Sequence, residues 1–370
     1  MKRLSIVVAV VAPLLLLLVL GSATANPTAR RVKQVSRPIA AVAMDGPRLA
    51  YVTDDNGVRV WNVRTGATTQ LRGGAGRYMN YPLIPEVAIA GTRVAWITVS
   101  INGNSLETWA RLYARSLSDR TAKRVESAFR RDGIGDGTVE IWDGNWLTGL
   151  VGSGNVLALS RWTTTPTADL RGMRISRQRL SVLDPRRPVL RVIATGDRSI
   201  ASASADRGRV AVLRTDDTVG IYSAAGALLK QITPTSAQEI AYGGDRLVVL
   251  THAKTLEVYD AKSGALLHTW PVHTKAPYLQ PGNLRAYGRI ALYFADSRRL
   301  VQRMHLVDLA TGKELVLPPN SHPGASANAA VGPLGVVYSV NTYRYGSNPK
   351  RAGTLVFEPT ARVLALIRRG

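Results

Sequence analysis

The sequence predicts an all-β fold, and three observations support this prediction. Short apolar segments alternate with polar residues at period 2, and Gly, Asp and Asn residues punctuate them every few positions. No long apolar stripe has the 3.6-residue period of a helix. One segment, VRVWNVRTG at residues 58–66, also recurs, as VGIYSAAG at 219–226, LEVYDAKSG at 256–264 and MHLVDLATG at 304–312. The fold is therefore expected to consist of repeats.

The first repeat can be divided into four strands. Residues 40–44 and 49–53 are apolar and are separated by a turn at 45–48, residues 58–62 alternate, and residues 67–72 follow a turn at Thr65 and Gly66. The Asn or Asp that precedes each such turn can accept hydrogen bonds from its backbone amides, and the Gly can adopt a left-handed conformation. The recurring segment is thus predicted to be a hairpin corner between a third and a fourth strand.

The spacing of the second strands predicts how many repeats there are. Successive copies are 45, 62, 54, 37, 43 and 46 residues apart, and four-stranded units of this length are typical of β-propeller blades. The copies begin at Leu49, Val94, Val156, Val210, Leu247, Ile290 and Val336. We therefore predict a seven-bladed β-propeller of four-stranded antiparallel blades, over residues 39–370.

The N-terminus has the order of a secretory signal. Met1, Lys2 and Arg3 precede an apolar run at 4–20, and small residues follow at Ala23 and Ala25. Residues 1–25 are predicted to be a signal peptide cleaved after Ala25, with an uncleaved anchor as the alternative, and the mature chain is expected to have no transmembrane helix. The protein would then be secreted or associated with the cell envelope.

The chain has no cysteine and a formal charge of +23. An exported fold without disulfides must be held together by burial and backbone pairing. A basic surface attracts polyanions, although charges spread over solvated turns would give the same total. No block of five like charges occurs, so no dedicated nucleic-acid motif is predicted.

The repeats resemble a known class of propeller. Tyr51 to Asp54 leading into VRVWNVRTG, with LEVYDAKSGALL at 256–267 and LVDLATGKEL at 306–315, is similar to the repeats of YVTN-type, quinoprotein-like (PQQ-like) and WD40-like β-propellers. Quinoprotein repeats usually place a Trp four residues after the turn glycine, but His268 and Val316 stand there and Trp270 comes two places late. The Gly-His pair of WD40 repeats is missing. The resemblance implies the fold, and it does not imply a quinone cofactor.

The two ends of the chain are expected to close the ring. Residues 32–35, VKQV, parallel residues 229–232, LKQI, which precede a first strand in the same way. The N-terminal segment at 26–38 is therefore a candidate outer strand of the last blade, beside either 354–357 or 362–367. The alternative is a disordered leader.

Connectivity separates long loops from short ones. In a propeller, the turns between strands one and two and between three and four lie on one face, and the other connections lie on the opposite face. The longest predicted loops all belong to the second group: 99–108, 163–178, 341–353, 72–85, 126–145 and 273–283. Binding usually resides in long loops on a rigid scaffold, so the ligand is expected on that face.

Arginines and tryptophans supply the candidate ligand-binding residues. One arginine precedes the second strand in five repeats, which would array a polyanion surface around the short-loop rim, unless each solvates its own turn: Arg48, Arg93, Arg209, Arg246 and Arg289. Trp109 and Trp142 lie in or beside long loops and could stack on a ligand, although packing between blades is the alternative.

Four acidic residues are close together in the 132–145 segment: Asp132, Asp136, Glu140 and Asp143. Hard cations such as calcium need several oxygen ligands, so these residues are a candidate calcium site, with a solvated acidic loop as the alternative. No other cofactor is predicted.

These features favour a binding or scaffolding module for a protein or an anionic cell-envelope polymer, expected to be a monomer. The alternative is a lactonase-like or quinoprotein-like enzyme with a metal or cofactor at the central channel. Three or more acidic or histidine side chains at one mouth of the channel would favour the enzyme.

Overall fold

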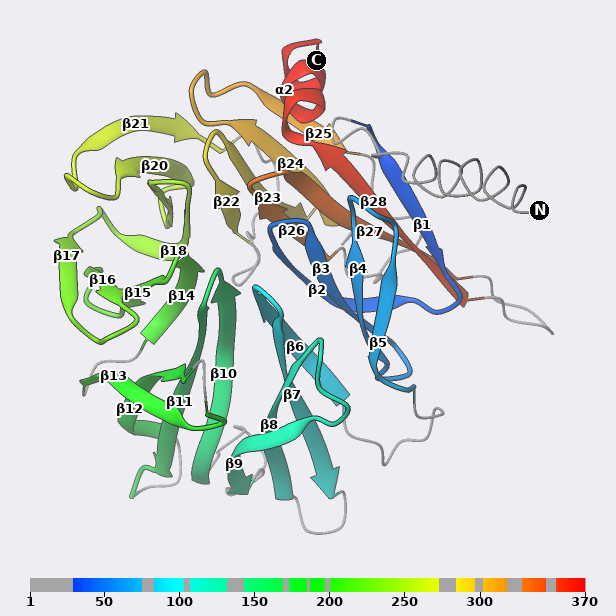
Figure 1. Cartoon of the computed structure of the whole chain (residues 1–370). Coiled ribbons are helices and arrows are strands. Elements are labelled where there is room, and N and C mark those ends of the chain that lie inside the picture. Colours follow the sequence, from blue (N-terminus) through cyan, green and yellow to red (C-terminus); the bar gives the residue numbers. More distant parts are fainter. Residues whose placement is uncertain are drawn as a thin grey trace, which may run out of the picture.

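The computed structural model is a propeller of antiparallel β-sheets arranged around a central opening (Figure 1). It describes residues 29–74, 83–102, 107–131, 143–168, 173–184, 187–196, 200–272, 284–296, 302–317, 328–343 and 351–369. These residues form five four-stranded sheets, one eight-stranded sheet and one helix. The predicted all-β class and the four-stranded antiparallel blades are confirmed.

The strands follow the sequence in regular groups. The first sheet contains β2 (Ile39–Asp45), β3 (Arg48–Thr53), β4 (Val58–Asn62) and β5 (Thr68–Arg72). The eight-stranded sheet contains β6 (Leu83–Ala90), β7 (Arg93–Asn102), β8 (Glu107–Ser116), β9 (Lys123–Arg131), β10 (Asp143–Ser153), β11 (Val156–Pro166), β12 (Met173–Leu183) and β13 (Leu190–Gly196).

The later groups repeat the four-stranded pattern. The next two sheets contain β14 (Ile200–Asp206), β15 (Arg209–Arg214), β16 (Val219–Ser223) and β17 (Leu228–Ile232), then β18 (Ala237–Gly243), β19 (Arg246–Thr251), β20 (Thr255–Asp260) and β21 (Leu266–Pro271). The last two contain β22 (Arg285–Tyr287), β23 (Ile290–Asp296), β24 (Gln302–Asp308) and β25 (Glu314–Leu317), then β26 (Ala329–Gly332), β27 (Gly335–Tyr343), β28 (Arg351–Pro359) and β1 (Arg31–Val35).

The first strand of each group lines the central opening. β2, β6, β10, β14, β18, β22 and β26 contact one another in this order, and β26 contacts β2 again. The hydrophobic core lies between neighbouring sheets. For example, Val248 and Leu250 of β19 pack with Ala291 and Tyr293 of β23. Each sheet is thus covered on both faces, which is why the second strands are apolar without alternation.

The prediction of seven separate blades does not match the sheets as they are hydrogen-bonded. β9 and β10 pair at two positions, Arg131 with Asp143 and Arg130 with Gly144, and this joins β6–β9 and β10–β13 into one sheet. Gly144 permits the close approach, because a Cβ there would lie 2.4 Å from the carbonyl oxygen of Phe129 and its φ is +124°. Sequence periodicity counts the repeats but does not show such a junction.

The N-terminal strand lies in the same sheet as the C-terminal strand. β1 pairs with β28 from Arg31 opposite Phe357 to Val35 opposite Gly353. Of the two positions expected for this segment, the structure has the one beside 354–357. The other, residues 362–367, lies in the α-helix α2 (Thr360–Arg369).

The helix α2 was not predicted. Its buried residues Val363, Leu364 and Ile367 belong to one hydrophobic cluster with residues of β23, β24, β26 and β27. The helix contacts β24, β25, β27 and β28 (Figure 1). Ten residues are too short for a convincing 3.6-period pattern beside so many strands. Among the described residues, no helix is both long enough and apolar enough to cross a membrane.

Several predicted loops are strands. β7 and β8 continue through most of 99–108, β11 and β12 through most of 163–178, and β9 and β10 through both ends of 126–145. β27 and β28 likewise reach residues 343 and 351. We call the extended ends of β7–β12 the arm: residues 99–102, 107–111, 127–131, 143–147, 161–166 and 173–179. These segments are rich in Thr, Ser, Arg and Asn, a composition that is typical of loops. Long hairpins have the same composition where they extend beyond the neighbouring blades.

The turn between the third and fourth strands has the predicted construction. The Asp260 carboxylate accepts from the amides of Lys262 and Ser263 at 3.1 and 2.8 Å, and Gly264 has a φ of +80°. Asn62 and Asp308 act in the same way, and Gly66 and Gly312 have φ values of +79° and +70°. The recurring segment is therefore structural.

Candidate functional site

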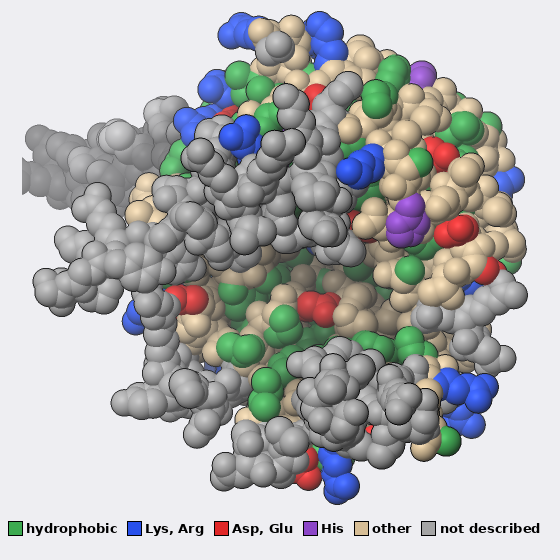
Figure 2. All heavy atoms as spheres, turned by 180° about the vertical axis from the view of Figure 1, so that it is seen from behind, with side chains coloured by type: hydrophobic (Ala, Val, Ile, Leu, Met, Phe, Trp, Pro, Cys, Tyr) green, Lys and Arg blue, Asp and Glu red, His purple; other side chains and the backbone are tan. Residues whose placement is uncertain are grey.

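The central channel is a cavity of about 510 Å³ lined by the innermost strands. Small side chains such as Ala43, Ala88, Ala203 and Ala330 form much of its wall. Figure 2, which shows the molecule from behind, has a hollow in which hydrophobic and acidic side chains are visible. The charged side chains of the lining are four carboxylates and one guanidinium: Asp45, Glu86, Asp206, Glu239 and Arg285.

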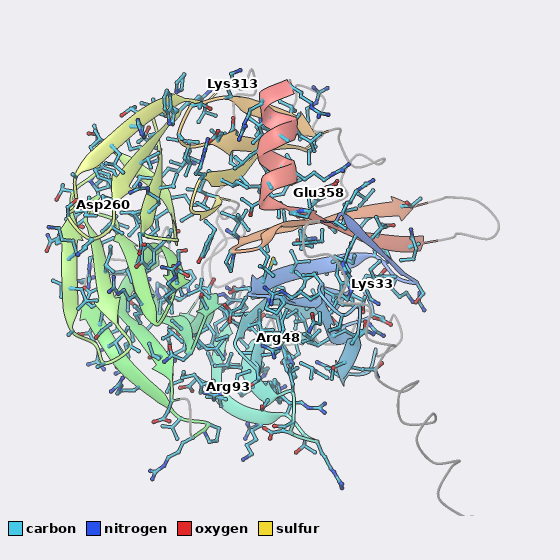
Figure 3. The ribbon with its side chains drawn as sticks, turned by 45° about the horizontal axis from the view of Figure 1, so that its top comes forward. Lys33, Arg48, Arg93, Asp260, Lys313 and Glu358 are labelled. Carbon is cyan, nitrogen blue, oxygen red and sulfur yellow. The ribbon has the colours of Figure 1, made fainter. Side chains whose placement is uncertain are left out.

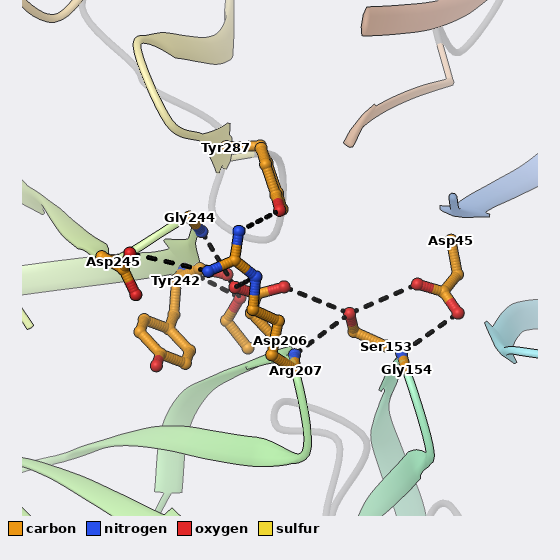
Figure 4. A network of polar contacts seen from close by, with 10 residues as sticks. Asp45, Ser153, Gly154, Asp206, Arg207, Tyr242, Gly244, Asp245 and Tyr287 are labelled. Atoms are coloured by element: carbon orange, nitrogen blue, oxygen red, sulfur yellow. Dashed lines mark hydrogen bonds and ion pairs between the residues drawn. The ribbon is translucent and has the colours of Figure 1, made fainter. Parts of the chain in front are cut away.

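Two-residue turns surround one mouth of the channel (Figure 4). The Asp45 carboxylate accepts from the amides of Gly91 and Gly154 at 2.5 and 3.0 Å, which belong to turns of the next sheet. Asp206 accepts from the Gly244 amide at 2.9 Å, and the Ser153 hydroxyl lies 3.4 Å from Asp45 and 3.3 Å from Asp206. These carboxylates therefore tie the turns of different sheets together.

Burial changes the acidity of this network. Asp206 is only 3% exposed, and burial raises the pKa of its carboxyl, even though the Gly244 amide, Arg207 and Ser153 each favour the ionised form. Arg207 lies on the solvent side, where its guanidinium donates to the Tyr287 hydroxyl at 3.1 Å and is 3.5 Å from Asp245. This mouth thus has a buried carboxyl, Asp206, whose cost of burial is offset in part by its hydrogen bonds, beside an exposed arginine, Arg207.

The opposite mouth is built from Glu86, Glu239 and Arg285. The Glu86 carboxylate accepts from the Leu150 amide at 2.7 Å and from the Thr148 hydroxyl at 3.1 Å, and burial raises its pKa. Glu239 accepts from the Leu284 amide at 2.8 Å and lies 3.9 Å from Arg285. Both glutamates thus join one innermost strand to another part of the ring.

The described part of the channel has two lining carboxylates at each mouth, rather than a group of three. Among the described residues, no group of three or more His, Asp or Glu side chains could hold a metal ion. Three of the four proposed calcium ligands, Asp132, Asp136 and Glu140, lie outside the described residues. Asp143 is described, in β10 opposite Arg131. The calcium site and the enzyme alternative both stay predictions.

The five repeated arginines all stand at the short-turn end of the second strands, as expected. Four begin β3, β7, β15 and β19, and Arg289 immediately precedes β23. Figure 3 shows Arg48 and Arg93 on neighbouring parts of the ring, and Asp260 on another side. The structure thus distributes these arginines around a rim.

Each of these arginines has a contact within the protein. Arg246 lies 3.1 Å from Asp260, and Arg289 bonds both oxygens of Asp308 at 3.0 and 2.5 Å. The other three bond the Gly91 carbonyl (Arg48, 3.4 Å), the Asp184 carbonyl (Arg93, 2.7 Å) and the Tyr242 side chain (Arg209). Burial raises the pKa of Asp308, but the bonds from Arg289 and the turn outweigh it, so this pKa lies below its usual value. The rim arginines therefore also serve blade structure.

The arm carries arginines that have fewer protein contacts. Arg161 of β11 lies directly opposite Arg179 of β12, and Arg177 lies opposite Thr163, on the same side of the sheet. Arg161 is 3.4 Å from Glu126 of β9. Arg177 and Arg179 are exposed. Like charges directly opposite each other destabilise a sheet, so this arrangement would gain stability from an anion.

The arm also contains the candidate Trp109. Its indole packs on Phe129 of β9, with a centroid separation of 4.6 Å, and remains 38% exposed. Trp142, the other candidate, lies outside the described residues. Trp146 has a partner, since the Arg130 guanidinium is 3.9 Å from its ring centroid.

Three polar features of the structure were not predicted from the sequence. They are the Asp45–Ser153–Asp206 network, the Glu86–Arg285–Glu239 group, and a buried cluster in which Glu314 accepts from Tyr293 at 2.6 Å and contacts His305. The first two sets come from strands far apart in the sequence, and no local motif connects them. The Tyr293 and His305 pair is opposite in register, and only a correct strand alignment could have shown it.

Comparisons with solved structures give similarities at low sequence identity. The computationally designed Ika8 protein is similar with a TM-score of 0.47 and 13% identity, covering 88% of this chain and 98% of that chain. Sqt1 of Saccharomyces cerevisiae is similar with a TM-score of 0.45 and 11% identity, covering 88% of this chain and 96% of that chain. No family model matches the sequence, and no curated protein matches it.

Proposed function

We propose that this protein is a binding module for a polyanion, and that the polyanion contacts the arm at Arg161, Arg177 and Arg179. The observation that carries the proposal is the placement of Arg161 directly opposite Arg179, with Arg177 beside them. Glu126 neutralises part of this charge through Arg161. Two exposed guanidiniums remain to bind the anionic groups of a ligand.

The overall charge supports the same function. A protein of formal charge +23 raises the local concentration of polyanions, and guanidiniums recognise carboxylate and phosphate groups in a bidentate manner. The arm belongs to the face where the long connections between second and third strands lie, which is the face expected to bind the ligand.

The remaining parts of the proposal concern architecture and location. We count the eight-stranded sheet as two blades, which gives seven blades of the WD40-like or quinoprotein-like type around the ring of innermost strands. The protein would be exported by its N-terminal signal, act as a monomer in the cell envelope or outside it, and bind an anionic envelope polymer or a protein with an acidic surface.

A salt titration of binding tests this function. The mature chain is titrated with inorganic polyphosphate and with polygalacturonate at several salt concentrations, alongside the double variant Arg177→Gln, Arg179→Gln. The control is Lys123→Gln, Arg124→Gln, which removes two exposed charges from the start of β9. We expect the arm variant to lose affinity for both polymers by about tenfold or more, and to show a weaker salt dependence.

A third variant distinguishes the arm from the rim. In it, Arg48, Arg93, Arg209, Arg246 and Arg289 are all replaced by Gln. If this rim variant loses binding and the arm variant keeps it, the ligand contacts the short-turn face and the arm assignment is wrong. Equal losses in the arm variant and in the Lys123, Arg124 control would show a nonspecific effect of net charge, which also contradicts it.

A further inference from the structure

The Trp109 side chain is 38% exposed. The other tryptophan side chains that the structure describes are buried or half-buried. Trp109 is held in the middle of a long strand, β8, with hydrogen-bonded neighbours on both sides: Ser100 of β7 and Phe129 of β9. A rigid strand thus presents a large flat apolar ring to solvent, at a considerable hydration cost.

The surroundings of Trp109 are fixed by the strand register. Residues directly opposite each other share a face of the sheet, and so do alternate residues along a strand. Trp109 therefore shares its face with Phe129, Arg111 and Arg131. The Arg111 guanidinium lies 5.7 Å from the centroid of the Trp109 ring, which is within range of a cation–π contact.

Hydrogen-bonding groups lie farther along the same face. Arg131 is opposite Asp143, and two residues later Asn145 is opposite Thr163, whose hydroxyl donates to the Asn145 amide oxygen at 2.8 Å. Thr163 is in turn opposite Arg177. An apolar ring, guanidiniums and neutral hydrogen-bonding groups are therefore arranged across β8–β12.

We propose that Trp109 is a stacking platform for a sugar ring, and that the ligand of the arm is an anionic polysaccharide. The C–H face of a pyranose would cover the indole, Arg111 and Arg131 would pair with carboxylate or sulfate groups, and Asn145 would bond hydroxyl groups. This inference rests on the proposed polyanion-binding function and specifies the class of its ligand.

Two observations favour a glycan over single-stranded nucleic acid. Sequence-independent binding of single-stranded nucleic acid uses several aromatic rings along a groove. The described part of this face exposes one indole, which packs on Phe129. Two carboxylates, Glu107 and Asp143, flank Arg131 on this face. They can accept hydrogen bonds from the hydroxyl groups of a sugar ring, which the nucleotides of a single-stranded DNA chain do not offer.

The test compares three ligands on one set of variants of the mature chain. The ligands are polygalacturonate, inorganic polyphosphate, which has no ring, and single-stranded poly(dT). The variants are Trp109→Ala and the matched control Ile101→Ala, which removes an apolar side chain of 57% exposure on the opposite face of the same hairpin. We expect Trp109→Ala to weaken polygalacturonate binding about tenfold and to leave polyphosphate binding unchanged. The control should affect neither.

The outcomes separate this inference from the proposed function. If Trp109→Ala leaves polygalacturonate binding unchanged while the Arg177, Arg179 variant lowers it, the polyanion function stands and the stacking inference is wrong. If Trp109→Ala weakens poly(dT) but not polygalacturonate, the ligand is a single-stranded nucleic acid and the glycan assignment is wrong. Binding of no polymer by the parent chain overturns the proposed function itself.

Discussion

The Trp270 indole donates a hydrogen bond to the Leu309 carbonyl oxygen at 2.9 Å, so an outer strand of one sheet is fastened to a turn of the next. The ring also lies on Gly312, where a Cβ would approach it to 2.4 Å. Trp270→Phe keeps a ring but loses the donor, and it should lower the free energy of unfolding by about 1 kcal/mol. Denaturant titration would measure this.

Gly312→Ala should be more costly, by about 2 kcal/mol or more, because it combines a collision with an unfavourable backbone conformation. The control is Gly66→Ala, at a φ of +79° with no atom within 4 Å of the added Cβ. This control reports the backbone cost alone. Equal losses for the two variants would mean that the contact with Trp270 contributes nothing.

Gly144→Ala should disrupt the junction between β9 and β10. The added Cβ would lie 2.4 Å from the Phe129 carbonyl oxygen and 2.9 Å from the Arg130 Cα, both backbone atoms that cannot move independently. We expect a loss of about 2–3 kcal/mol and faster amide hydrogen exchange in β9 and β10. Gly288→Ala, with a φ of +59° and open space, serves as the control. Unchanged exchange in Gly144→Ala would show that the junction does not limit opening of these strands.

Asp206→Asn should stabilise the protein at neutral pH. Burial raises the pKa of this carboxyl, so between the unfolded and folded pKa values the native state binds more protons, and stability falls as pH rises through that window. Asn keeps an acceptor for the Gly244 amide without the charge. The difference in stability between the variant and the parent should shrink as the pH falls below about 4, the pKa of an Asp in the unfolded chain. Thermal unfolding from pH 3 to 8 would show it.

Asp308→Asn should change stability in the opposite direction and destabilise the protein at neutral pH. Its pKa is lowered in the folded state because the bonds from Arg289 and the turn outweigh burial, so its contribution is present above the unfolded pKa and is lost as pH falls through the folded pKa. The variant should be less stable than the parent at pH 7, and the two should converge in acid. If both variants shifted stability in the same direction at pH 7, the assignment of the two pKa changes would be wrong.

Asn341→Ala should weaken the closure of the ring. Its side chain is 1% exposed, accepts from the Ile39 amide at 2.8 Å and donates to the Ile39 carbonyl oxygen at 2.9 Å. Removing it leaves a buried amide without this acceptor, at a cost of about 2 kcal/mol. Thr342→Ala changes the exposed neighbouring residue and should cost little. A comparable loss in both would indicate a general effect on β27.

The sequence was sufficient for the local architecture. The turn at Asp260 and Gly264 follows from which side chains can bond a turn and which residue tolerates a left-handed backbone, and both are local properties. The likeness of residues 32–35 to 229–232 indicates an outer strand of the last blade, but it left two positions open, beside 354–357 or 362–367, and the structure has the first. The junction at Gly144 and the helix α2 could not be predicted. Each depends on packing between segments that are not linked by the sequence repeat.

The candidate site was harder to predict. The spacing correctly placed Arg246 and Arg289 before the second strand, but not their contacts with Asp260 and Asp308, which follow from cross-strand register. Arg161 and Arg179 are 18 residues apart and stand just outside the two ends of the predicted loop 163–178. Only the continuation of β11 and β12 places them opposite each other.

The pairing of β1 with β28 has a consequence for how the protein is made. Gln34 and Thr354 are partners in one sheet although 320 residues separate them, so the ring cannot close before almost the entire chain has been synthesised. Contacts of such long range slow folding, and until β28 has been made β1 lacks the strand with which it pairs. A ribosome-bound chain would thus stay unclosed until its C-terminal strand has emerged.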